Sequence, residues 1–318
     1  MTGGVATLGE TMALLSVPAN GMLREPAPVG MGGAESNVAI GLSRLGVPVT
    51  WMSRLGDDAL GAHVRREIRA EGVRVLAARD AVAPTGLMLK EHRNGTPNRV
   101  RYYRAGSAAS RMTEADVDAD AIVAADVLHL TGITPALGAG PRQAMAYAIE
   151  VARGAGTLVS LDVNHRRTLW SDAEAQAVFA ELLPSVDLLF AGVSEAAMVL
   201  GAPEGPGGWD GGAELAAKLS TAGPRTVVIK LGPLGSLALA EGTLFRAFAE
   251  RRAVVDPVGA GDAFVAGYLS VLCRGGAVDR CLATGNQAGG VVVTVPGDWE
   301  GLPFAGELSQ VIEDEVIR

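Results

Sequence analysis

Hydrophobic positions along the chain change their spacing repeatedly, which predicts helices alternating with strands. In 37–45 the apolar Val38, Leu42 and Leu45 fall on one helical face, and Gly46 follows where a left-handed residue would end the helix. Helical spacing recurs at 57–72, 141–153, 194–200 and 212–219, and a strand is predicted at 50–53. Mainly apolar runs of strand length occur at 127–130, 158–163, 188–190 and 226–231. Strands covered on both faces have such runs, so the pattern predicts an α/β fold with three layers around a parallel sheet.

Two segments break this alternation and predict a small second sheet. Residues 11–29 contain three prolines and two short strand-like pieces, and 86–104 is typical of two strands around an Asn94-Gly95 turn. Because two strand–helix units separate these segments, they must meet in space as a lid at the edge of the main sheet. We therefore predict a β lid from 11–29 and 84–110, and an α/β core from 1–10, 30–83 and 111–318.

Composition and charge narrow the class of partner. The 318 residues suffice for one large α/β domain with an appendage, and 48% hydrophobic with 19% charged residues exclude a disordered chain. The net charge of −8, with no concentration of basic residues, argues against binding to nucleic acid or a membrane surface. No apolar run of about 18 residues and no secretory pattern occur, so we expect a cytoplasmic protein whose partners are small molecules.

Cysteine and histidine give no metal or redox motif. Cys273 and Cys281 have a spacing that suits neither CxxC chemistry nor a zinc ribbon, so we expect two buried thiols in a reducing compartment. No metal-binding spacing is present among the four histidines, His63, His92, His129 and His165. A structural zinc is therefore not expected.

The strongest chemical signal is DPVGAGD at 256–262, between a predicted strand at 253–255 and a helix from Ala263. The backbone N–H groups of Gly259, Ala260 and Gly261 would form an anion hole at the positive end of the helix. Asp262 would then take a proton from a hydroxyl that attacks a γ-phosphate. The alternative is an Asp that only caps the helix.

Neither a GxxxxGK[ST] nor a GxGxxG motif is present, which disfavours a P-loop kinase or an NAD enzyme.

Five motifs in order along the chain carry a resemblance to a known family: GGAESN at 32–37, LGDDALG at 55–61, VIKLGPLGS at 228–236, DPVGAGDAF at 256–264 and TGNQAGG at 284–290. Together they resemble the ribokinase (PfkB-type) family of carbohydrate kinases over nearly the whole chain. The resemblance implies a ribokinase-like core with a β lid, ATP and Mg²⁺ as cofactors, and phosphoryl transfer to a sugar hydroxyl with Asp262 as base.

Within that family the chain is most similar to the 2-keto-3-deoxygluconate kinases. The similarity is carried by YYR at 102–104, LHLTGITPAL at 128–137 and SLDVNHRRTLW at 160–170. It implies phosphorylation of the terminal primary hydroxyl of a sugar acid, most closely 2-keto-3-deoxygluconate, to its 6-phosphate. The residues themselves agree, because Arg104 and Arg166 suit a carboxylate better than a neutral sugar.

The resemblance also assigns residues to the substrate. Gly33 would allow close backbone approach, Asn37 would bind hydroxyls, and Asn164 would lie at a strand end where ligands of α/β sheets collect. The full predicted substrate set is Gly33, Asn37, Tyr102, Tyr103, Arg104, Asn164, Arg166, Asp262 and Asp298. Alternatives remain for several of these: a solvated surface position for Arg166 beside Arg167, cross-strand packing for the two tyrosines, and an ordinary loop position for Asp298.

Other residues are assigned to the nucleotide and its metal. The predicted nucleotide set is Gly192, Lys230, Gly232, Gly235, Ser236, Gly259, Gly261 and Asn286, although glycines in a turn by themselves would predict only a hairpin. Glu195 would organise hydrated Mg²⁺ through water. The chain departs from the family here, because Gly192 stands where an Asn is common. A monovalent cation at Asp256 and nearby carbonyls, as in some relatives, is left open.

The sequence is also compatible to different degrees with three other functions, and it predicts one assembly. Another sugar kinase, such as a fructokinase or a 5-dehydro-2-deoxygluconokinase, is the runner-up, and a non-catalytic sugar or nucleotide sensor of the same fold is a second alternative. Asp262 with its glycines argues against the sensor, and the missing fingerprint argues against a hydride-transferring oxidoreductase. Exposed strand edges and an apolar face of the lid predict a homodimer or higher homo-oligomer joined through the lids.

Overall fold

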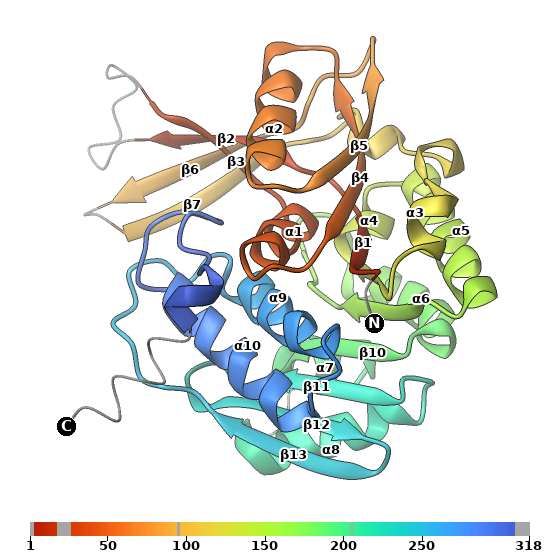
Figure 1. Cartoon of the computed structure of the whole chain (residues 1–318), viewed down its shortest axis with the longest axis vertical. Helices are drawn as coiled ribbons and strands as arrows, with labels where there is room; N and C mark the ends of the chain where they lie inside the picture. The colour runs from red at the N-terminus through yellow and green to blue at the C-terminus, as the bar shows by residue number, and fades with distance from the viewer. Residues whose placement is uncertain (1–2, 18–26, 94–95, 204, 206, 309–318) are drawn as a thin grey trace.

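The computed structural model describes residues 3–17, 27–93, 96–203, 205 and 207–308 (Figure 1). Its main sheet has, in spatial order, β13 (Thr243–Phe248), β12 (Gly235–Ala240), β11 (Thr226–Lys230), β10 (Leu188–Gly192), β9 (Leu158–Asp162), β8 (Val127–Thr131), β1 (Val5–Leu8), β4 (Val49–Gly56) and β5 (Arg74–Asp80). Neighbouring strands from β11 to β5 are parallel, and β12 and β13 continue the sheet antiparallel at one edge. The predicted parallel sheet is confirmed.

Helices cover both faces of this sheet, which confirms the three layers. One layer contains α1 (Ala34–Arg44), α2 (Ala59–Ala70), α9 (Ala260–Leu272) and α10 (Val278–Val292). The other contains α3 (Ala119–Val123), α5 (Ala139–Ala155), α6 (Asp172–Leu182), α7 (Val193–Val199) and α8 (Gly208–Ser220), while α4 (Ile133–Ala136) is a short helix after β8. Strand β10 shows why both faces are apolar: Leu188 and Phe190 pack in one core cluster, and Leu189 and Ala191 in the other.

Local signals set the ends of the helices where the sequence predicts them. The side chain of Asp58 caps α2 by accepting a hydrogen bond from the N–H of Gly61 over 2.7 Å. Gly46 after α1 and Gly72 after α2 have φ of 76° and 81°, the left-handed conformation that ends a helix. The same features bring the following strands back into the sheet.

The second sheet is formed by β3 (Val29–Gly32), β2 (Met12–Val17), β6 (Leu87–Arg93) and β7 (Thr96–Tyr103), in this spatial order. Strands β2 and β6 are parallel and the other two pairs antiparallel, so distant segments of the chain do meet in one lid. β3 extends to Gly32, past the end of segment 11–29. The predicted turn at Asn94-Gly95 lies outside the described residues, as does 18–26.

One predicted strand is wrong. Residues 253–255 form an irregular segment beyond the edge strand β13, and the N–H of Val255 bonds to the carbonyl of Val293 in a loop, over 2.7 Å. The apolar residues of this segment do not mark a strand. Val254 borders a cavity and is 63% exposed. The helix after it begins at Ala260 instead of Ala263, because Gly259 supplies its start with φ of 78°.

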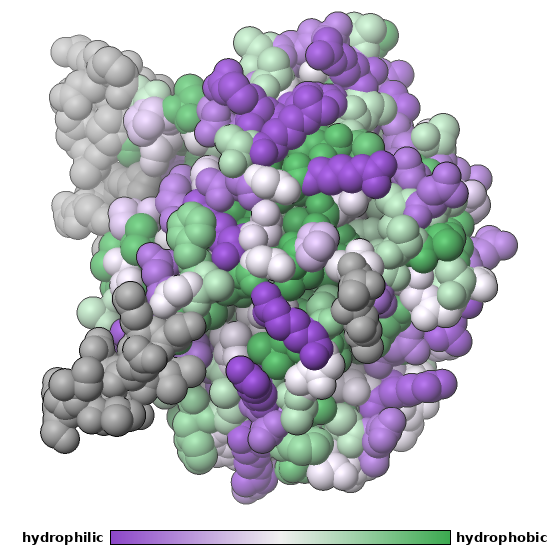
Figure 2. Space-filling view, in the orientation of Figure 1, coloured by the Kyte–Doolittle hydropathy of each residue, from purple (hydrophilic) through white to green (hydrophobic). Residues whose placement is uncertain are grey.

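The described residues include two buried cysteines and neither a metal-binding cluster nor a membrane-spanning helix. Cys273 and Cys281 are buried and free, as predicted. Among the described residues no three His, Cys, Asp or Glu side chains gather in a way that could hold a metal, and no helix is long and apolar enough to cross a bilayer. In Figure 2 hydrophilic and hydrophobic side chains interleave over the visible face, with many hydrophilic ones over α2.

Candidate active site

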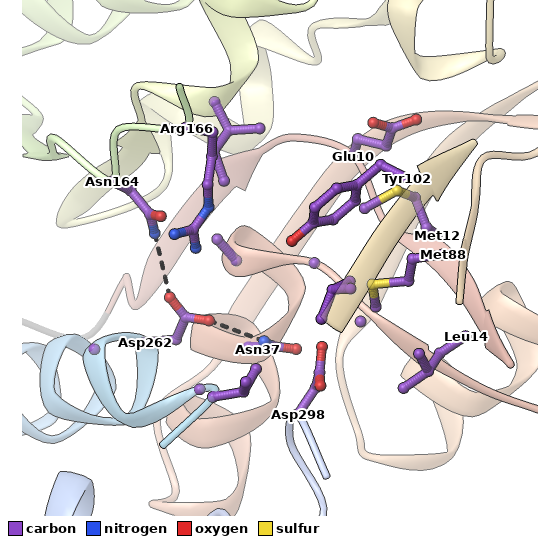
Figure 3. Close-up of a pocket in the computed structure, with 18 of the residues that line it drawn as sticks. Glu10, Met12, Leu14, Asn37, Met88, Tyr102, Asn164, Arg166, Asp262 and Asp298 are labelled. Atoms are coloured by element: carbon purple, nitrogen blue, oxygen red, sulfur yellow. Dashed lines mark hydrogen bonds between the residues drawn. The ribbon is translucent and has the colours of Figure 1, made fainter. Parts of the chain in front are cut away.

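A cavity of about 400 Å³ lies between the lid and the carboxyl ends of the parallel strands. Glu10 follows β1, Asp162 ends β9 and Lys230 ends β11, so three strand ends place polar side chains along it. The lid contributes apolar side chains from its inner face, Met12, Leu14, Met88 and Val100, together with the ring of Tyr102 (Figure 3). Such a cavity offers both polar recognition and exclusion of water.

Asp262 lies at the base of this cavity, in the first turn of α9, and is 8% exposed. Its Oδ2 accepts a hydrogen bond from Nδ2 of Asn37 over 2.9 Å, and its Oδ1 accepts one from Nδ2 of Asn164 over 3.4 Å (Figure 3). Asn164 has φ of 38°, a left-handed conformation that Asn tolerates better than most residues. Three residues predicted from separate motifs are therefore brought together.

The electrostatics around Asp262 favour a carboxyl group that changes charge near neutral pH. Burial raises its pKa to about 7, and the charge of Asp162 acts in the same direction. The hydrogen bond from Asn37 and the positive charges of Arg166 and Lys230 oppose the increase without cancelling it. A base with a pKa close to the working pH can accept a proton and release it again.

The glycine-containing turn before α9 depends on its glycines. Gly259 has φ of 78°, and a Cβ added there would lie 2.1 Å from the carbonyl oxygen of Asp298. A Cβ at Gly261 would lie 3.6 Å from Nζ of Lys230, so the ammonium is close to this turn. Turn amides, helix start and ammonium together form an electropositive corner beside Asp262.

Lys230 is held in this corner by Asp162. Its Nζ lies 2.8 Å from both carboxylate oxygens of that residue. Burial opposes the charge on Lys230, but Asp162 and Glu195 outweigh it, and the pKa of the ammonium is raised. Lys230 is therefore a fixed positive charge.

A second cavity of about 570 Å³ lies on the other side of the glycine turn. Its lining includes five of the eight predicted nucleotide residues, Lys230, Gly232, Gly235, Gly261 and Asn286, together with Ala260 of the predicted anion hole. The Nδ2 of Asn286 donates to the carbonyl of Ala247 over 2.9 Å, which fixes its side chain at the cavity wall. Lys230, Pro257 and Gly261 border both cavities, so two ligands would meet there.

Three predicted residues are not brought to either cavity. Tyr103 is 60% exposed, because adjacent residues on β7 face opposite sides of the lid sheet and Tyr102 takes the inner side. Ser236 is fully buried on β12, and Gly192 lies at the end of β10 without bordering a cavity. The remaining predicted residues, Gly33 and Asp298 included, line one cavity or the other.

The two predicted arginines differ in their partners. The Nε of Arg104 donates to Oε2 of Glu10 over 2.7 Å, and its Nη2 forms an ion pair with the same oxygen. The guanidinium also stacks on the ring of Tyr102, 5.8 Å from the centroid. Arg166 is exposed, makes no ion pair with a described residue, and points toward Asp262 in Figure 3. Of the two arginines, Arg166 is therefore the one whose positive charge is available to a ligand.

Glu195, the predicted Mg²⁺ residue, borders the first cavity with its carboxylate held by backbone. Oε1 accepts from the N–H of His165 over 3.0 Å, and Oε2 accepts from the N–H of Gly192 over 2.7 Å. A single oriented carboxylate suits Mg²⁺, which keeps several waters and takes other ligands from phosphates. The residues present therefore fit a hydrated Mg²⁺ that arrives with a nucleotide.

Sequence reasoning missed three charged residues of the site. Glu10 follows the first strand, and Asp162 is the single acidic residue within the apolar run 158–163. A charge at the end of a buried parallel strand was the signal that could have found both. Lys90, which follows three apolar residues of β6, is 2% exposed and borders the first cavity.

The fold and the two joined cavities are typical of an enzyme that transfers a group between two ligands. A model of the pfkB family of carbohydrate kinases matches residues 5–305. The chain belongs to this family, and it is a sugar kinase with the ribokinase-like fold.

Named relatives cover nearly the whole chain. It is 37% identical to a 2-dehydro-3-deoxygluconokinase from Bacillus subtilis (strain 168), over 96% of this chain and 94% of the relative. A 2-dehydro-3-deoxygalactonokinase from Haloferax volcanii is 35% identical over 100% of this chain and 96% of its own length. The crystal structure of a 2-dehydro-3-deoxygluconokinase from Thermotoga maritima matches with a TM-score of 0.90 and 28% identity, over 97% of this chain and 99% of that one.

Proposed function

We propose that the enzyme phosphorylates the terminal primary hydroxyl of a sugar acid, first of all 2-keto-3-deoxygluconate, which is the 2-dehydro-3-deoxygluconate of the relatives' names. The observation that carries the proposal is the position of Arg166. Its guanidinium makes no ion pair within 4 Å among the described residues, although its charge acts on Asp262 and Asp162 from a distance. It shares a cavity with Asp262 and the hydroxyl of Tyr102 (Figure 3). A ligand carboxylate would complete this pairing.

The arrangement supports a direct transfer. Asp262 takes the proton from the attacking hydroxyl, while Asn37 and Asn164 hold its two oxygens in place. The amides of Gly259 to Gly261 and the ammonium of Lys230 face the transferring phosphoryl group and balance its charge. A positioned general base contributes about 10²- to 10⁴-fold to the rate.

We assign ATP to the second cavity, with its last phosphate at the junction formed by Lys230, Pro257 and Gly261. Asn286 would lie beside the base, and Glu195 would hold hydrated Mg²⁺ through water. The metal supplies charge neutralisation at the phosphates when bound. Because ATP is supplied in the cytoplasm, we propose that the enzyme acts there.

The lid supports exclusion of water from this reaction. Its inner face presents the apolar side chains of Met12, Leu14 and Met88 to the first cavity. A closed, apolar cover keeps water from replacing the sugar as acceptor. Arg104 borders the same cavity, and its contribution to a carboxylate is smaller because Glu10 already shares its charge.

The test is a panel of sugar acids and neutral sugars in a coupled assay of ATP consumption, with both 2-keto-3-deoxygluconate and its galactonate epimer. We expect turnover of the acids and little turnover of fructose. Arg166→Gln should raise KM for the acid by about tenfold or more, the loss of one charge-assisted contact. Arg167→Gln is the matched control, because Arg167 is exposed and paired with Asp172 on the surface.

The panel also separates the rival functions. Preferred turnover of fructose, with KM for acids unchanged in Arg166→Gln and Arg104→Ala, would favour a kinase of neutral sugars. Preferred turnover of 5-dehydro-2-deoxygluconate, which is itself a sugar acid, would favour a 5-dehydro-2-deoxygluconokinase whatever the arginine variants do. Binding of sugar and nucleotide without ATP consumption would favour a sensor. Each of these results contradicts 2-keto-3-deoxygluconate as the first substrate.

We further propose a homodimer joined through the lids. The outer face of the lid carries Leu15, Leu87, Leu89 and Tyr103, with Val29 beside them on β3, and these side chains are half-buried or exposed. An apolar sheet face and an open edge favour pairing with a second copy. Light scattering should give twice the monomer mass, and Leu89→Glu should lower it. A monomeric wild-type enzyme at assay concentration contradicts this proposal.

A further inference from the structure

The side chain of Lys90 crosses from the lid to the loop that begins the anion site. It extends from the inner face of β6, is 2% exposed, and lies with Nζ 2.6 Å from Oδ2 of Asp256. The same Nζ lies 3.0 Å from Oδ1 of Asp298 and 3.4 Å from the carbonyl oxygen of Gly297. Two carboxylates and a carbonyl thus surround one ammonium group.

This oxygen shell is of the kind that binds a monovalent cation. Asp256 is fully buried, and its other contacts are with the N–H groups of Val258 over 3.1 Å and Gly297 over 3.2 Å. The sequence leaves open a monovalent cation at Asp256 and nearby carbonyls, but the ammonium of Lys90 already fills the space between the carboxylates of Asp256 and Asp298 and the carbonyl of Gly297. A second positive charge there would face the ammonium at short range, which like charges oppose. The residues present do not fit a separate cation at this carboxylate.

The shell is also connected to the glycine turn. Asp256 begins the segment 256–262, and the carbonyl oxygen of Asp298 lies 2.1 Å from the position of a Cβ at Gly259. The backbone of Asp298 therefore packs directly against the residue that starts α9. An ion bound between Asp256 and Asp298 fixes both sides of this turn.

We propose that the Lys90 ammonium replaces a monovalent cation, so that the enzyme carries its own cation, attached to the lid, and works without potassium. Lys90 is a positioning residue, because it acts on the anion site through Asp256 and Asp298. The Lys90 ammonium stays protonated. Burial lowers its pKa, but the two carboxylates outweigh this effect, so the pKa of the ammonium is raised. The inference rests on the proposed function in so far as the turn 259–261 binds phosphate.

The experiment compares wild type, Lys90→Ala and Lys218→Ala in potassium, ammonium, lithium and tetramethylammonium chloride at equal ionic strength. Lys218 is the matched control, since it is exposed and, among the residues that the structure describes, forms an ion pair with Glu214 alone, one turn away on α8. Lys90→Ala removes the ammonium and opens space for an ion between two buried carboxylates. Turnover, KM for ATP and the thermal midpoint Tm are measured in each salt.

For wild type and Lys218→Ala we expect turnover to vary less than twofold among the salts. Lys90→Ala should lose at least tenfold in tetramethylammonium and recover most of it in potassium or ammonium, with saturation, while lithium recovers little. The Tm of Lys90→Ala should rise with potassium more than with lithium, and the other two proteins should show no such difference. A purely structural loss would be equal in all four salts.

Several results overturn the inference. Potassium activation of the wild type by several-fold shows that a separate ion is needed. Equal loss of activity or equal failure to fold of Lys90→Ala in every salt shows that no ion can replace the ammonium. The Tm measurement needs no sugar, so it decides the inference even if the panel of substrates contradicts the proposed function.

Discussion

The Nδ2 of Asn37 lies 2.9 Å from Oδ2 of Asp262, although 225 residues separate them in the chain. Asn37 is on the first turn of α1, and Asp262 is on the first turn of α9, so two helix starts meet at the same point. Nδ2 of Asn164 approaches the other oxygen from the end of β9. The carboxylate on α9 is thus oriented by residues from two other regions of the core, which suits a general base.

Replacing Asp262 with Asn should abolish most of the activity and leave nucleotide binding intact. The amide keeps the shape of the side chain but cannot accept a proton, so we expect kcat to fall by about a hundredfold or more. Turnover is measured by the coupled assay and ATP binding by calorimetry. Near-normal kcat in Asp262→Asn would remove Asp262 from its role as base.

The pH dependence of the wild type should report the same group. Burial raises the pKa of Asp262 to about 7, and only the deprotonated carboxylate accepts a proton. We therefore expect kcat/KM for the sugar to fall tenfold per pH unit well below pH 7, and to level off above it. The profile is measured from pH 5 to 9 with the sugar acid fully ionised throughout. A profile that stays flat down to pH 5 contradicts a raised pKa.

The raised pKa of Asp262 also has a consequence for stability. Between the usual pKa of 3.8 and about 7, the folded protein binds this proton more tightly than the unfolded chain does. Protonation of Asp262 therefore contributes fully to the free energy of unfolding below pH 3.8, the pKa in the unfolded chain, and this contribution is lost as the pH rises through about 7. Asn carries no charge, so Asp262→Asn should gain stability over wild type at pH 8, by at most about 4 kcal/mol.

Urea unfolding at pH 4.5 and pH 8 measures this effect without any substrate. The difference between variant and wild type should be larger at pH 8. Asp120→Asn is the control, because Asp120 is exposed in the first turn of α3. A difference that does not change with pH would show that burial of Asp262 carries no such cost.

Periodicity and turn chemistry were sufficient to predict the strand–helix units and the lid, and the family resemblance assigned Asn37, Asn164 and Asp262 to one substrate site. Other features depend on three-dimensional neighbours that spacing does not reveal. The sequence presents Arg104 as a free cation, and only the fold places the buried Glu10 against it. The apolar run 253–255 was predicted as a strand, yet no strand pairs with it, and its valines border a cavity or solvent instead.

The two adjacent tyrosines of β7 should behave differently. Tyr102 is on the inner face of the lid with its hydroxyl directed into the cavity, and Tyr103 is on the outer face (Figure 3). Tyr102→Phe should raise KM for the sugar acid by about five- to tenfold, the loss of one hydrogen bond. Tyr103→Phe should leave KM and kcat unchanged. Equal effects of the two substitutions would contradict the assigned faces.

Gly259→Ala should damage both stability and catalysis, because two independent constraints require glycine there. Its φ of 78° costs a residue with a side chain about 1–2 kcal/mol, and the added Cβ would lie 2.1 Å from the backbone oxygen of Asp298. Relief of this contact must move either the turn or the loop of Asp298, and both border the first cavity. We expect the free energy of unfolding to fall by more than 2 kcal/mol and kcat to fall with it.

Gly154→Ala provides the matched comparison for Gly259→Ala. Gly154 is exposed in the last turn of α5, and an added Cβ would meet no atom within 4 Å. This substitution should be neutral or stabilising by about 0.5 kcal/mol, since Ala favours the helix over Gly, and should leave kcat unchanged. Urea midpoints and turnover are measured for both variants side by side. If Gly259→Ala were as stable and as active as Gly154→Ala, the turn would not need its left-handed residue, and the anion site would have to be placed elsewhere.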